Sequence, residues 1–164
     1  MEIKGKFDHF NINVTDLARS IDFYGRALGL HEIGRQKAED GSFELVFLGD
    51  GESNFHLELT WLRDKEGAYE LGDNESHLCI RVAGDYDAVR EFHRANGWVC
   101  FENHEMGLYF INDPDDYWIE VLPLKRKGAP FRWNPPRAGR AEGAHEPNPS
   151  PHPAPRANQQ RRAS

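Results

Sequence analysis

The sequence has little cysteine, no long apolar run and, before its last part, far fewer basic than acidic residues. Its 164 residues include two cysteines, Cys79 and Cys100, which are too few for the disulfide framework of a small secreted domain. No apolar run is long enough to span a bilayer, and no signal segment opens the chain. We therefore expect a cytoplasmic protein that neither enters a membrane nor depends on disulfides.

Composition changes near residue 129. Residues 129–164 hold eight of the ten prolines and six arginines, with only two acidic residues and no apolar periodicity. We predict a folded domain over 1–128 and a disordered Pro/Arg-rich tail over 129–164. The folded part keeps 14 basic against 25 acidic side chains, a balance of −11, and should repel nucleic acid and anionic membranes. The basic tail could contact either, although short tails of this kind are more often solvated.

Hydrophobic spacing predicts one structural unit that occurs twice. The first copy is expected to contain a strand over 8–14, a helix ending at Gly29, and strands near 30–35, 43–48 and 55–60. The second copy is expected to contain a strand over 77–82, a helix over 86–95, and strands over 98–101, 108–111 and 117–122. We therefore predict an α+β fold made of two βαβββ repeats.

Each predicted repeat carries a histidine on its first strand and a glutamate on its last. These residues are His9 and Glu58 in the first repeat and His77 and Glu120 in the second. Glu120 shares a strand face with large apolar neighbours, where an ionised carboxylate is costly unless a positive group meets it. Two imidazoles and two carboxylates suit a divalent ion such as Ni²⁺, Zn²⁺, Co²⁺ or Mn²⁺.

Each of these residues also has a simpler interpretation. A single strand histidine is more often solvent-facing or paired within the protein than bound to a metal. Glu58 could lie on the exposed face of an edge strand, and Glu120 could pair with Arg81 or Lys125. The matching positions in two repeats favour the metal-site hypothesis over four separate accidents.

Three motifs resemble the glyoxalase I (lactoylglutathione lyase) family of the vicinal oxygen chelate superfamily. They are His9 with Val14-Thr-Asp-Leu-Ala-Arg-Ser-Ile-Asp-Phe-Tyr24, Leu57-Glu-Leu-Thr60 with His77, and Asp113-Pro-Asp-Asp-Tyr-Trp-Ile-Glu120. The resemblance covers nearly all of residues 4–124 and none of the tail. A glutamate at position 58 favours the glyoxalase branch over extradiol dioxygenases and fosfomycin-resistance enzymes, which use His, His and Glu.

The resemblance implies a ligand set and an assembly. His9, Glu58, His77 and Glu120 would bind one divalent metal per site. A histidine as the first ligand resembles the Ni²⁺- or Co²⁺-activated bacterial type more than the Zn²⁺ type, although Zn²⁺ stays possible. The resemblance also implies a homodimer in which one chain contributes His9 and Glu58 and the other contributes His77 and Glu120.

The implied reaction isomerises the hemithioacetal of methylglyoxal and a thiol to an S-lactoyl thioester. A carboxylate moves the carbon-bound proton to the neighbouring carbon through an enediolate, while the ion polarises the substrate oxygens. We assign Glu120 as the main base and Glu58 as its counterpart. Substrate contacts are expected at Asn13 and Arg81, with the small-molecule thiol adduct as the partner and neither nucleic acid nor membrane involved.

The sequence departs from the family where glutathione should be held. Asn13 and Leu62 stand where these enzymes commonly have Arg and Asn, and Arg81, at the repeat-related position of Asn13, could supply the missing cation or simply pair with an acidic neighbour. The sequence therefore leaves two alternatives for the thiol of the substrate, glutathione and a different thiol. Alternative hypotheses are a small-molecule binding or resistance protein of the same superfamily, an epimerase, or a dioxygenase that would require Fe²⁺ and O₂.

Overall fold

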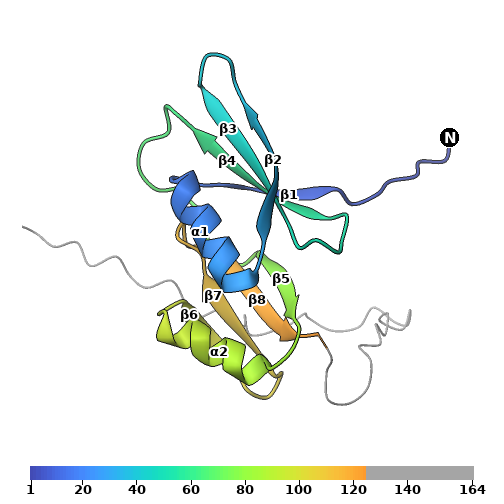
Figure 1. Cartoon of the computed structure of the whole chain (residues 1–164), viewed down its shortest axis with the longest axis vertical. Coiled ribbons are helices and arrows are strands. Elements are labelled where there is room, and N and C mark those ends of the chain that lie inside the picture. The colour runs from blue at the N-terminus through green and yellow to red at the C-terminus, as the bar shows by residue number, and fades with distance from the viewer. Residues whose placement is uncertain (125–164) are drawn as a thin grey trace, which may run out of the picture. The chain divides into compact units, whose positions relative to one another are not determined.

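Residues 1–124 are described by the computed structural model and contain the βαβββ pattern twice (Figure 1). The first repeat consists of β1 His9–Asn13, α1 Leu17–Leu28, β2 His31–Lys37, β3 Phe43–Gly49 and β4 His56–Leu62. The second consists of β5 His77–Val82, α2 Tyr86–Ala95, β6 Val99–Asn103, β7 Leu108–Asn112 and β8 Trp118–Pro123. The predicted fold class is confirmed. The predicted tail, 129–164, and the boundary at residue 128 lie outside the described residues.

Each repeat builds its own four-stranded mixed sheet. The strand orders are β1-β4-β3-β2 and β5-β8-β7-β6, so the two sheets have the same topology. In both, the strand before the helix pairs in parallel with the last strand of the repeat, and the remaining pairs are antiparallel. Since β4 lies between β1 and β3, the interpretation of Glu58 as a residue of an edge strand is wrong.

Local sequence signals explain where the two helices begin and end. The side chain of Asp16 caps α1 by accepting from the Arg19 amide, and Asp85 caps α2 by accepting from the Asp87 and Ala88 amides. Gly29 ends α1 with a φ of 71°, a left-handed conformation that glycine adopts without steric cost. These caps fix the points at which the chain returns to each sheet.

One hydrophobic core joins the two repeats. It takes β-branched and leucine side chains from the apolar faces of both sheets, together with Tyr24 from α1 and Tyr109 from β7. Val46, Leu59, Ile111 and Val121 are fully buried in it. Each such side chain stabilises the fold by about 1.5–3 kcal/mol relative to exposure. The opposite faces of the sheets are left to the polar residues that make the candidate site.

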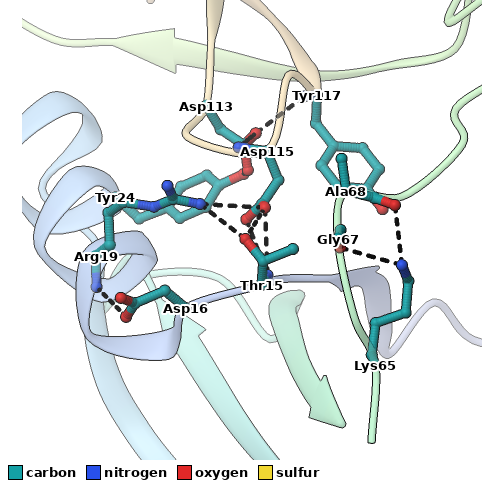
Figure 2. A network of polar contacts seen from close by, with 10 residues as sticks. All are labelled: Thr15, Asp16, Arg19, Tyr24, Lys65, Gly67, Ala68, Asp113, Asp115 and Tyr117. Carbon is teal, nitrogen blue, oxygen red and sulfur yellow. Dashed lines mark hydrogen bonds and ion pairs between the residues drawn. The ribbon is translucent and has the colours of Figure 1, made fainter.

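A polar network links the start of the first repeat to the last turn of the second (Figure 2). The Thr15 amide donates to Asp115 at 3.2 Å, and the Arg19 guanidinium donates to the same carboxylate. The hydroxyl of Tyr24 donates to Asp113 at 2.9 Å in a buried position. These bonds hold the β1–α1 connection against the turn that precedes β8, which places both repeats with respect to one another.

None of the helices formed within residues 1–124 has the length and apolar character needed to cross a membrane.

Candidate metal and acid–base site

The first half of the site lies on the adjacent parallel strands β1 and β4. The Nε2 atom of His9 is 3.3 Å from the Oε2 atom of Glu58. The other ring nitrogen, Nδ1, lies 2.8 Å from a carboxylate oxygen of Asp8, and this hydrogen bond is the main cause that raises the pKa of His9. A proton held on Nδ1 by Asp8 leaves the Nε2 lone pair directed at whatever lies beside Glu58.

The second half repeats this arrangement on β5 and β8. The Nε2 atom of His77 is 3.5 Å from the Oε2 atom of Glu120, and the Glu120 side chain is only 16% exposed. An aromatic edge supports the histidine in each half, since Phe47 packs T-shaped on His9 and Phe110 packs T-shaped on His77. The structure thus gives two copies of one His–Glu–Phe cluster, one in each sheet.

The donor atoms of each pair fit a divalent ion. A nitrogen and an oxygen that bind one ion at bond lengths of about 2.1 Å and a right angle lie about 3 Å apart, close to the separations seen here. Imidazole nitrogen and carboxylate oxygen are ligands that Zn²⁺, Ni²⁺ and Co²⁺ accept. One pair supplies only two donors, so a complete coordination sphere needs both pairs or additional oxygen ligands.

The two pairs do not meet within one chain. Among residues 1–124, no three His, Cys, Asp or Glu side chains come close enough to hold an ion together. His77 lines a small cleft of about 50 Å³ together with Phe10, Leu78 and Ile119.

Glu58 is held by two side chains that the sequence reasoning missed. Asn11 donates to Oε1 of Glu58 at 2.9 Å, and the hydroxyl of Thr60 lies 3.1 Å from the same oxygen. Both residues share the face of Glu58, Asn11 as its register partner on β1 and Thr60 two residues along β4. The carboxylate is thereby oriented with Oε2 toward His9.

Glu120 has different neighbours. Its register partner on β5 is Cys79, and two residues along β8 lies the buried side chain of Leu122. Burial, and then the interaction with Glu120, raise the pKa of the Cys79 thiol to about 12. Leu108, Phe110 and Leu122 form a second apolar cluster with Phe101 and Trp118, so Glu120 faces a largely apolar wall. This agrees with the sequence analysis, which placed Glu120 among apolar residues.

Asn13 and Arg81, the predicted substrate contacts, occupy matching ends of the two polar faces. Asn13 is the register partner of Thr60, and Arg81 is the register partner of Leu122. The Arg81 guanidinium donates to the Pro123 carbonyl at 3.0 Å and makes no ion pair with Glu120. The interpretation of Glu120 as a partner of Arg81 is therefore wrong, and Lys125, the other alternative partner, lies outside the described residues.

The supporting residues were missed for identifiable reasons. Asp8 precedes His9 in the sequence, so a carboxylate beside a candidate ligand was a visible signal. Asn11 lies on the expected strand over 8–14, two residues after His9, and therefore on the same strand face. Its contact with Glu58 depends on the parallel register of β1 and β4, which no local pattern specifies.

The family comparison covers the described part of the chain almost completely. Residues 6–121 match the model of the Glyoxalase/Bleomycin resistance protein/Dioxygenase superfamily. A lactoylglutathione lyase of Neisseria meningitidis serogroup A is 34% identical over 124 residues, which span 71% of this chain and 89% of that protein. A lactoylglutathione lyase of Escherichia coli O157:H7 is 31% identical over 129 residues, spanning 73% and 93%.

Solved structures give the same result at the level of the fold. The trypanothione-dependent glyoxalase I of Leishmania major superposes with a TM-score of 0.64 at 30% identity, covering 73% of this chain and 87% of that one. The glyoxalase I of Zea mays has a TM-score of 0.62 at 27% identity and covers 71% of this chain, but this chain accounts for only 43% of the maize protein.

Proposed function

Because the chain belongs to the Glyoxalase/Bleomycin resistance protein/Dioxygenase superfamily, we propose that it is a metal-dependent lactoylglutathione lyase. Its reaction is the isomerisation of the hemithioacetal of methylglyoxal and a thiol to the S-lactoyl thioester, a step of methylglyoxal detoxification. The enzyme class is carbon–sulfur lyase, which is the class of the similar proteins named lactoylglutathione lyase.

The observation that carries the proposal is the pair of His–Glu contacts. His9 with Glu58 and His77 with Glu120 bring a nitrogen and an oxygen to 3.3 and 3.5 Å at equivalent places in two repeats. A cavity that only binds a small molecule needs neither pair. The hypothesis of a binding or resistance protein therefore has less support than a lyase.

We assign roles to the residues from their positions. His9, Glu58, His77 and Glu120 would hold the ion, which would supply a positive charge that polarises the substrate oxygens. Glu120 takes the proton from the carbon next to the thioether sulfur and delivers it to the neighbouring carbon. Glu120 lies against an apolar wall, and Glu58 would hold the ion from the first repeat.

A homodimer completes the site in this proposal. One chain would supply His9 and Glu58, and its partner would supply His77 and Glu120. The two histidines lie on β1 and β5, and both strands are edge strands of their sheets, with backbone groups available to a neighbour. Exposed apolar side chains near β1, namely Phe7 and Phe10, are 88% and 44% exposed in the single chain and suit an interface.

The thiol and the metal are the finer parts of the proposal. We favour Ni²⁺ or Co²⁺ over Zn²⁺ because the first ligand is His9 rather than an amide. Glutathione is the thiol named for the similar lyases, whereas the name of the Leishmania major neighbour specifies trypanothione. Asn13 offers no cation for a thiol's carboxylate, so Arg81, at the matching place in the second repeat, could provide one. A cytoplasmic location stays a prediction.

Turnover by the metal-stripped full-length protein tests the proposal. The methylglyoxal–glutathione hemithioacetal is supplied after reloading with Ni²⁺ in one sample and Zn²⁺ in another, and thioester formation is followed by absorbance. We expect Ni²⁺ to restore the activity and Zn²⁺ to restore little. Tight binding of one ion per site without thioester formation in either sample would contradict the assignment of this substrate.

A further inference from the structure

The two carboxylates of the proposed site are equivalent in the repeats but are held by different side chains. Two residues occupy matching places around each carboxylate. One is its register partner on the neighbouring strand, and the other lies two residues along its own strand. These residues are Asn11 and Thr60 around Glu58, and Cys79 and Leu122 around Glu120.

One carboxylate oxygen of Glu58 accepts hydrogen bonds from both of these neighbours. Oε1 accepts from the Asn11 amide at 2.9 Å and from the Thr60 hydroxyl at 3.1 Å. The Asn11 amide also lies 2.6 Å from the Thr60 hydroxyl oxygen. Since that oxygen accepts from the amide, its own hydrogen is directed at Glu58. The three side chains form a closed set that leaves Oε2 facing His9.

Glu120 lacks such a set. Within residues 1–124, Glu120 lies 3.5 Å from His77 and has a hydrogen bond with the Cys79 thiol, but it has no amide or hydroxyl donor of the kind that holds Glu58. A thiol is a weak hydrogen-bond donor and a leucine has none, so the Cys79 and Leu122 positions offer little resistance to rotation of the carboxylate. The two halves therefore differ in the freedom of their carboxylates, even though the His–Glu separations are similar.

We propose that Asn11 and Thr60 are positioning residues that keep Glu58 in place as the stationary ligand, and that Cys79 and Leu122 leave Glu120 free to leave the ion and move the proton. This inference rests on the proposed function and adds to it the physical basis for the division of labour. A fixed carboxylate is preorganised for an ion, while a base has to change its contacts during the reaction.

Affinity for Ni²⁺ tests the first part without any turnover. Isothermal titration calorimetry of the full-length protein compares Asn11→Ala with Cys79→Ala, the matched change in the other repeat. We expect Asn11→Ala to weaken Ni²⁺ binding by roughly tenfold, as losses of such supporting hydrogen bonds do, and Cys79→Ala to change it by less than about twofold. Equal effects of the two variants would overturn the inference.

A pair of changes at Thr60 distinguishes positioning from packing. Thr60→Val keeps the shape and removes the hydroxyl, so it should weaken Ni²⁺ binding, whereas Thr60→Ser keeps the hydroxyl and should retain the affinity. Thermal denaturation of both variants checks that the fold is intact. If Thr60→Ser weakens Ni²⁺ binding as much as Thr60→Val, the hydroxyl does not position Glu58.

The proposed freedom of Glu120 predicts that a new hydrogen bond to its carboxylate slows the reaction. Cys79→Asn places an amide where Asn11 stands in the other repeat, and we expect kcat at saturating Ni²⁺ to fall about tenfold with no loss of Ni²⁺ affinity. An unchanged kcat would contradict the proposed freedom of Glu120. If the unmodified protein does not turn over the hemithioacetal, the proposed function fails, while the Ni²⁺ comparisons still decide whether Asn11 and Thr60 position Glu58.

Discussion

At the residue scale, Glu120 is a proposed metal ligand with apolar surroundings and, among residues 1–124, no amide or hydroxyl donor. These properties suit a base that alternates between binding an ion and accepting a proton. Glu58 has the same place in its repeat but two donors on one oxygen. The difference between the two carboxylates comes from their neighbours, Asn11 and Thr60 in one half and Cys79 and Leu122 in the other.

Glu120→Gln should therefore remove turnover while the protein still binds Ni²⁺. The amide oxygen can remain near the ion, but an amide cannot accept the carbon-bound proton, and loss of a general base costs about 10²- to 10⁴-fold in rate. Steady-state kinetics and calorimetry on the same sample measure both effects. Glu58→Gln is the matched change and should affect Ni²⁺ binding more than Glu120→Gln does. An active Glu120→Gln variant would refute the assignment of the base.

Asp113 is a second carboxylate with an unusual environment, and it shapes the dependence of stability on pH. It is 4% exposed, and burial raises its pKa to about 6 in spite of hydrogen bonds from Tyr24 and two backbone amides. Because the folded-state pKa lies above the ordinary value of 3.8, the folded protein binds this proton more tightly than the unfolded chain. Its stabilising contribution is complete below pH 4 and is lost as the pH rises through 6.

Asp113→Asn should remove the loss of stability that accompanies ionisation of Asp113. The amide oxygen can accept from the amides of Asp115 and Tyr117 as Oδ1 does, and its NH₂ group can donate to the Tyr24 hydroxyl. We expect the free energy of unfolding of the variant, relative to that of the unmodified protein, to be about 1–3 kcal/mol higher at pH 7.5 than at pH 4, from 1.36 kcal/mol per pKa unit. Urea denaturation at both pH values measures the free energy of unfolding. A difference between the two proteins that stays constant with pH would show that Asp113 does not titrate in this range.

At the scale of elements, a buried histidine joins the two helices to the second sheet. His93 of α2 is fully buried, with Nε2 2.7 Å from the Ala27 carbonyl of α1 and Nδ1 2.8 Å from the Tyr109 hydroxyl of β7. The contact at Ala27 requires a donor, so Nε2 carries the proton and Nδ1 accepts from tyrosine. Burial lowers the pKa of His93, which keeps the ring neutral in the folded protein.

Tyr109→Phe should destabilise the protein by about 1–3 kcal/mol, because it leaves the Nδ1 atom of His93 buried without its donor. The loss should come with little change in the far-ultraviolet circular dichroism, since the helices and strands themselves are not altered. Chemical denaturation at pH 7.5 measures the free energy. A change below about 0.5 kcal/mol would mean that water or another group replaces the hydroxyl.

The helices and strands could be predicted from the sequence, but the side-chain contacts between them could not. Alternating strand residues and the stop at Gly29 predicted β1 and α1 because these patterns are local. The second helix was predicted with the bounds that it has. The bond between His93 and Ala27 joins residues that are distant in sequence, and nothing in either segment indicates its partner. The same holds for Asn11 and Glu58, whose contact depends on strand register.

At the scale of the whole molecule, the sequence predicted which four residues make the candidate site. It did not determine how the two pairs come together. The four residues form two pairs as expected from the repeats. The pairs stay apart within residues 1–124, where no three His, Cys, Asp or Glu side chains lie close enough to share an ion. The proposed function completes the site with a second chain, and this is its central claim.

Mixing two inactive variants tests this claim most directly. One variant carries His9→Ala with Glu58→Ala, the other carries His77→Ala with Glu120→Ala, and each is confirmed to be folded before they are mixed, partly unfolded and refolded together with Ni²⁺. If sites form between chains, half of the dimers contain both variants and each of these has one intact site of two. The mixture should then regain about a quarter of the activity of the unmodified protein. No recovery from dimers shown by mass spectrometry to contain both variants would contradict a site shared between chains.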